Sequence, residues 1–77
     1  MAARYTLTPS PERVGTSVPH AWLGRDVQDL LDGRCGTLMD VCVEENQYGL
    51  RYDAAYIRGA DAREFVIPVT QMRLVSC

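Results

Sequence analysis

The chain has 77 residues and a mass of 8.6 kDa, and 47% of its residues are hydrophobic and 23% charged. This length leaves room for one domain with one core, and this composition excludes a disordered tail. The net charge of -2 and the isoelectric point near 5.1 argue against a general nucleic-acid binder, because phosphate recognition needs a basic surface. Every basic residue is arginine, which is typical of GC-rich coding in a bacterium.

Residues 1–20 predict an irregular, proline-rich N-terminal arm, and residues 21–77 predict a single small domain. Within the arm, only residues 4–8 alternate like a short strand. Two interpretations of the arm stay open: a loosely ordered terminus, or a strand added to a sheet edge of its own chain or of a neighbour. We expect partial order through Tyr5 and Leu7.

The domain begins with a stretch that fits either a short strand or one helical turn, because Val27, Leu30 and Leu31 have helical spacing. The Asp32-Gly33 pair that follows predicts a tight turn, since glycine adopts positive φ without a steric penalty.

Residues 35–43 give the clearest strand. Strict alternation places Cys35, Thr37, Met39, Val41 and Val43 on one face, and Gly36, Leu38, Asp40, Cys42 and Glu44 on the other. Residues 48–58 predict a second strand, with Tyr48, Leu50, Tyr52, Ala54 and Tyr56 on one face.

Residues 63–70 predict a third strand with Phe65, Ile67 and Val69 facing one way. Pro68 cannot donate to a ladder, so it belongs at an edge or a bend. Residues 72–75 end the pattern as a short strand or a helical turn. Together these segments predict an all-β fold, a small closed or partly open β-barrel of about five to six short strands with an irregular N-terminal arm.

Two parts of the chain resemble PRC-barrel domains. The run LGRDVQDLLDGRCGTLMDV from Leu23 to Val41 resembles their opening hairpin, and the segment from Arg63 to Leu74 resembles their closing strand. The chain also resembles short actinobacterial proteins of unknown role. The resemblance implies a six-stranded barrel that acts as a non-catalytic docking module, as in a ribosome-maturation factor and a photosynthetic reaction-centre subunit. The arm before His20 and the lack of an attached second domain depart from the family pattern and leave the partner open.

The sequence predicts no catalytic or metal site. His20 has no base or nucleophile partner nearby and is expected at the surface or as a cap. Cys35 and Cys42 are seven residues apart, so alternation puts them on opposite faces and they cannot share a metal. Cys77 is expected to be an incidental terminal residue. The carboxylates Asp29, Asp32, Asp40, Glu44 and Glu45 are expected to be solvated. We therefore expect no enzyme activity and no cofactor.

The odd number of cysteines predicts reduced thiols in the cytoplasm, and no apolar stretch is long enough to span a membrane. The candidate partner-binding residues are Tyr48, Arg51, Tyr52, Tyr56 and Arg58, because interfaces favour tyrosine and arginine. The alternative is that the tyrosines line the core, where we also expect Trp22.

The sequence thus predicts a non-catalytic protein-interaction module that binds a protein partner, or a second copy of itself as a homodimer. One alternative is a ribosome- or RNA-associated factor, which would stack bases on aromatic side chains. A second is a phage or mobile-element protein that binds a host complex.

Overall fold

The computed structural model describes residues 9–76, so the expectations for Tyr5, Leu7 and Cys77 lie outside the described residues. The elements in chain order are β1 (Asp26–Asp29), β2 (Cys35–Glu45), β3 (Arg51–Gly59), β4 (Glu64–Pro68), the 3-10 turn η1 (Val69–Gln71) and β5 (Met72–Leu74). The predicted all-β class is confirmed for this part of the chain.

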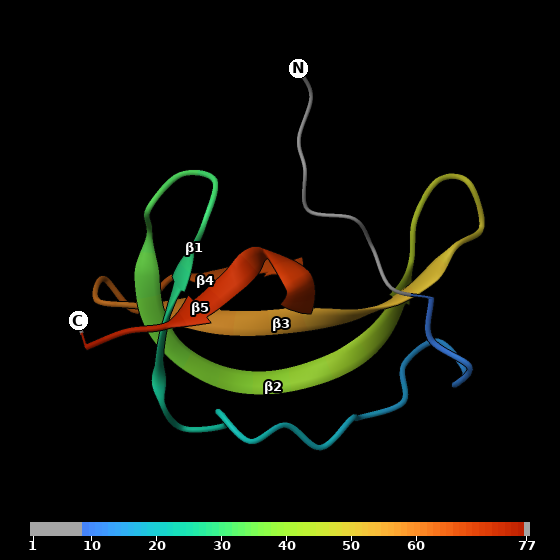
Figure 1. Cartoon of the computed structure of the whole chain (residues 1–77), viewed down its shortest axis with the longest axis horizontal. Coiled ribbons are helices and arrows are strands. Elements are labelled where there is room, and N and C mark those ends of the chain that lie inside the picture. The colour runs from blue at the N-terminus through green and yellow to red at the C-terminus, as the bar shows by residue number, and fades with distance from the viewer. Residues whose placement is uncertain (1–8, 77) are drawn as a thin grey trace.

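The five strands form one antiparallel sheet in the order β4-β3-β2-β1-β5. The first four strands follow one another as a meander, and η1 then carries the chain back so that β5 pairs with β1. Figure 1 shows β2 curving beneath β3 while β1 and β5 lie across one end of it. Strands β4 and β5 are the two edges and do not pair with each other, so the sheet is not closed.

Strand β1 settles the choice between a strand and a helical turn at the start of the domain. It pairs with β2 on one side and with β5 on the other, which buries Val27 completely. The chain then turns at Leu30–Gly33, and Gly33 has a φ of +80°. The turn predicted from Asp32-Gly33 is confirmed.

A β-bulge corrects the faces predicted for β2. The register with β3 pairs Leu38 with Ile57 and Asp40 with Tyr56. Met39 is therefore an extra residue that has no pairing partner on β3. Strict alternation placed Met39 with Val41, but Leu38 is fully buried and Met39 is 44% exposed. The bulge reverses the alternation and bends the strand.

Two backbone hydrogen bonds close the turn between β3 and β4. Gly59 N–H donates to the Arg63 carbonyl at 2.9 Å, and Ala62 N–H donates to the Gly59 carbonyl at 3.0 Å. Ala62 has a φ of +66°, in the left-handed region that favours glycine. On the neighbouring strand, a Cβ on Gly36 would lie 2.3 Å from the Arg58 carbonyl oxygen, so only glycine fits this close strand approach.

The described part of the arm lies along both long strands. Ser17 forms an isolated bridge with Cys42 on the side of β2 that β1 leaves open, and Pro9 forms one with Tyr52 on the far side of β3. Val18 N–H donates to the Val41 carbonyl at 2.7 Å. The arm therefore adds to the sheet of its own chain: it pairs with β2 past the end of β1, and with β3 past the end of β4 (Figure 1).

The core lies on the concave side of the sheet. The buried members of its main cluster are Val27, Leu38, Val41, Ala55, Ile57, Ile67 and Met72, and Val18, Trp22, Phe65 and Val69 pack against them half-buried. Val43 and Ala54 are also completely buried. The expected core position of Trp22 is confirmed. Pro68 ends β4, an edge strand, as expected for a residue without an N–H.

Candidate functional site

The convex side of β2, β3 and β4 carries the side chains that the core does not use. Residues directly opposite one another in an antiparallel pair share a face. The register therefore builds two rows on this side, Asp40–Tyr56–Val66 and Cys42–Ala54–Pro68, with Glu44 beside Tyr52 in a third. We call Cys42, Glu44, Tyr52, Ala54 and Tyr56 the tyrosine face.

A hydrogen bond fixes the position of one tyrosine on this face. The Tyr56 hydroxyl donates to the Glu44 carboxylate on the neighbouring strand. This bond, together with burial and the negative charge of Glu44, raises the pKa of Tyr56 to about 12. The ring of Tyr56 is thereby held in place without belonging to the core.

The thiol of Cys42 lies in the middle of the face. Its Sγ is 3.2 Å from Asp40 Oδ2 and 3.8 Å from the hydroxyl of Ser17 in the arm. Burial and the hydrogen bond to Asp40 raise the pKa of the Cys42 thiol. The thiol is therefore protonated at neutral pH and acts as a small, nearly apolar surface group rather than a nucleophile.

The structure brings together only part of the predicted site. Tyr52, Tyr56 and Arg58 lie on the convex side of β3, whereas Arg51 lies on the opposite side by alternation. Tyr48 does not lie on the strand at all, because β3 begins at Arg51 and Tyr48 sits in the preceding turn, 83% exposed. None of the three tyrosines is part of the core cluster, and Tyr52 and Tyr56 are half-buried on either side of the buried Ala54.

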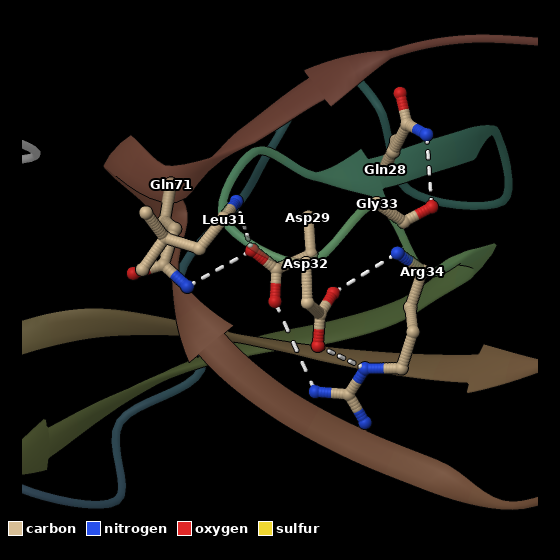
Figure 2. A network of polar contacts seen from close by, with 7 residues as sticks. All are labelled: Gln28, Asp29, Leu31, Asp32, Gly33, Arg34 and Gln71. Carbon is tan, nitrogen blue, oxygen red and sulfur yellow. Dashed lines mark hydrogen bonds and ion pairs between the residues drawn. The ribbon is translucent and has the colours of Figure 1, made fainter.

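A second group of polar side chains joins the β1–β2 turn to η1 (Figure 2). Asp29 is 2% exposed, and its Oδ1 accepts hydrogen bonds from Leu31 N–H at 2.8 Å and from Gln71 Nε2 at 3.0 Å. The Arg34 guanidinium lies 3.8 Å from Asp29 Oδ2. The expectation that Asp29 is solvated is wrong, because residues distant in the sequence cover it.

Arg34 also binds the exposed carboxylate beside it. Its Nε donates to Asp32 Oδ2 at 2.6 Å, and its backbone N–H donates to Asp32 Oδ1 at 3.0 Å. These contacts, the backbone hydrogen bond foremost, lower the pKa of Asp32. The guanidinium carbon of Arg34 lies 4.1 Å from the centre of the Phe65 ring, so one arginine connects the β1–β2 turn to β4.

A hollow of about 470 Å³ lies between this arginine and the β3–β4 turn. Arg34, Cys35 and Phe65 form one part of its lining, and Asp61 and Arg63 belong to the turn. Arg63 lies 3.8 Å from Asp61, and the acids offset the arginines, so the hollow has no dominant charge that would select a ligand.

The two internal cysteines do not form a metal site. The bulge places Thr37 and Asp40 on one face, so Cys35 and Cys42 share that face, contrary to the alternation expected from the sequence. They are separated by seven positions, roughly 20 Å along the strand. Within residues 9–76, no group of three or more His, Cys, Asp or Glu side chains is placed to hold a metal ion.

His20 is a capping residue, as expected. Its Nδ1 accepts a hydrogen bond from Trp22 N–H at 3.1 Å, and its ring meets the Trp22 ring edge-on at 5.2 Å. This contact orders the turn between the arm and β1.

In the described range, no helix is long and apolar enough to cross a membrane. Comparison with protein-family models, with curated proteins and with solved structures finds no match to this chain.

Proposed function

We propose that this chain is a non-catalytic docking module that binds a protein partner through the tyrosine face. The observation that carries the proposal is the position of Tyr52 and Tyr56, which lie half-buried on the convex side of β3 and do not belong to the core cluster. Large aromatic side chains outside the core are typical of binding surfaces.

Preorganisation supports this use of the face. Glu44 holds Tyr56 in one orientation, so a partner need not order that ring on binding. Ala54, completely buried between the two tyrosines, provides a rigid floor. The protonated Cys42 adds no charge there.

The edge of the face is polar, as in protein interfaces. Arg58 follows Tyr56 along β3, and its guanidinium lies 3.4 Å from the Glu64 carboxylate of β4. An exposed ion pair of this kind contributes little to stability, and it remains available to a partner's polar groups.

The RNA-associated alternative gains no support from this face. Glu44 and Asp40 lie directly beside Tyr52 and Tyr56, where a nucleic acid would bring its phosphates. Like charges there would oppose the electrostatic term on which RNA affinity depends. The phage alternative has no residue that favours it.

The PRC-barrel relationship and the cytoplasmic location also remain proposals. A single curved sheet with a close glycine approach at Gly36 is compatible with a small barrel whose strands β4 and β5 converge after η1. Such barrels serve as docking modules in that family, in agreement with the proposed role.

The experiment is site-specific photo-crosslinking in the cells from which the chain comes. A benzophenone amino acid replaces Tyr52, and in a matched control it replaces Tyr48, which is exposed and lies off the tyrosine face. We expect a nuclease-resistant adduct with a different protein from position 52 and none from position 48. The absence of such an adduct at position 52, or equal adducts at both positions, would contradict the proposal.

A further inference from the structure

The outer edge of β4 is open. This strand pairs with β3 on one side, and among residues 9–76 no strand pairs with its other side. An open edge presents unpaired N–H and C=O groups to any other extended chain.

The hairpin fixes which backbone groups point outward. Gly59 N–H donates to the Arg63 carbonyl, so these two residues form a hydrogen-bonded pair of the ladder. By alternation, the backbone N–H and C=O groups of Phe65 and Ile67 also point toward β3. The N–H and C=O of Glu64 and Val66 therefore point to the open side, as does the carbonyl of Pro68.

We infer that β4 pairs in antiparallel fashion with β4 of a second copy of this chain, with a twofold axis at Val66. In this register the two Val66 residues exchange both of their backbone hydrogen bonds. Glu64 lies opposite Pro68 of the second copy, so the Glu64 N–H meets the Pro68 carbonyl at each end. This inference does not depend on the proposed function, because strand pairing at the edge of β4 needs no different protein bound to the tyrosine face.

The side chains are self-complementary in the same register. Val66 is 48% exposed on the convex side, where its neighbour on β3 is Tyr56. Across the axis it meets Val66 of the second copy, so four side chains form one continuous row, Tyr56–Val66–Val66–Tyr56. On the concave side, Phe65 lies opposite Ile67 of the second copy. Cross-strand pairs of β-branched and aromatic residues stabilise a sheet.

Charge and hydrogen bonding disfavour the symmetric registers with an axis at Glu64, Phe65 or Pro68. An axis at Glu64 would oppose two carboxylates, and an axis at Pro68 would oppose two residues without an N–H. An axis at Phe65 would place the Glu64 carboxylate against Val66 and extend the pairing into the turn before β4. With the axis at Val66, Glu64 keeps its partner Arg58, 3.4 Å away in its own chain.

The first test is the oligomeric state of the full chain, measured by sedimentation equilibrium from low to high micromolar concentration. We expect a dimer that Val66→Lys converts to a monomer, because an edge lysine blocks strand addition. Met39→Lys is the matched control: Met39 is similarly exposed, at 44%, but lies on β2, so this variant stays dimeric. Circular dichroism verifies that both variants are folded.

The second test reads the register directly. In a chain whose native cysteines are replaced by serine, Val66→Cys is expected to form an intermolecular disulfide on mild oxidation, because the paired Cα atoms lie about 5.5 Å apart. Glu64→Cys is not expected to form this disulfide, because position 64 of one copy lies roughly 13 Å from position 64 of the other. A monomeric wild type, a dimer that survives Val66→Lys, or cross-linking at position 64 instead of 66 would each overturn the inference.

Discussion

Gln71 donates a hydrogen bond from Nε2 to Oδ1 of Asp29 at 3.0 Å, across 42 positions of the sequence. The contact fastens η1, which leads into β5, to the turn that leads out of β1 (Figure 2). The same carboxylate oxygen accepts the Leu31 N–H of that turn. One buried acid therefore orients both the edge strand β5 and the β1–β2 hairpin.

Asp29→Ala is expected to lower the free energy of unfolding by about 2–3 kcal/mol, because it leaves a backbone N–H and an amide without their acceptor. Urea denaturation followed by Trp22 fluorescence measures the change. Asp32→Ala is the matched control, since Asp32 is an exposed acid of the same turn and its loss should have a much smaller effect. Equal losses in the two variants would contradict the role assigned to Asp29.

Ala62→Gly is expected to stabilise the fold by about 1 kcal/mol, because Ala62 has a φ of +66° and a non-glycine residue is strained there. The midpoint of thermal unfolding reports the gain. Ala60→Gly, in the same turn but without a positive φ, should instead be slightly destabilising, since it only adds freedom to the unfolded chain. A gain in both variants would show that turn flexibility, and not strain, is the cause.

Alkaline pH is expected to weaken the fold through Tyr56. Its pKa is raised from 10.0 to about 12, so the folded state holds its proton more tightly than the unfolded state does. The contribution is fully present below about pH 10 and is lost as pH rises towards 12. Tyrosinate absorbance during titration should show one ionisation near pH 12 that is missing in Tyr56→Phe.

Glu44→Gln distinguishes the cause of that shift. Removing the carboxylate removes the charged acceptor and the negative charge beside Tyr56, so the pKa of Tyr56 should fall toward its ordinary value. A pKa that stays near 12 in Glu44→Gln would mean that burial alone raises it.

The Cys42 thiol is expected to react slowly with iodoacetamide at pH 8, because burial and the hydrogen bond to Asp40 raise its pKa. Asp40→Asn should accelerate alkylation, which mass spectrometry of the Cys42 peptide measures. The cysteine background is Cys35→Ser with Cys77→Ser. If alkylation is equally slow in Asp40→Asn, burial and not the carboxylate limits the reaction.

Local signals in the sequence were sufficient for the class of fold and for most strand positions. Alternation located β2, and Asp32-Gly33 located its preceding turn. The position of Tyr48 was also readable: Asn46 accepts hydrogen bonds from Tyr48 N–H and Leu50 N–H, and Asn46 and Gly49 are residues that favour turns. The alternation continues through this turn, so the strand predicted over residues 48–58 begins three residues before β3.

Features that depend on pairing could not be read from the sequence. Leu38, Met39 and Val41 are all apolar, so the sequence does not show whether Leu38 or Met39 shares a face with Val41. Only the register with β3 shows that Met39 is unpaired. The burial of Asp29 likewise results from a glutamine far along the chain. Val66 is a neighbour of Tyr56 only because of the register in which β4 pairs with β3.

The arm has a dynamic consequence. Ser10, Gly15 and Val18 donate their backbone N–H groups to carbonyls at the margins of β2 and β3, and no further strand covers the arm in the described range. These hydrogens can exchange with solvent when the arm alone lifts away, whereas the amides between β2 and β3 exchange only when the sheet opens. We therefore expect the amides of the arm to exchange faster than those between β2 and β3.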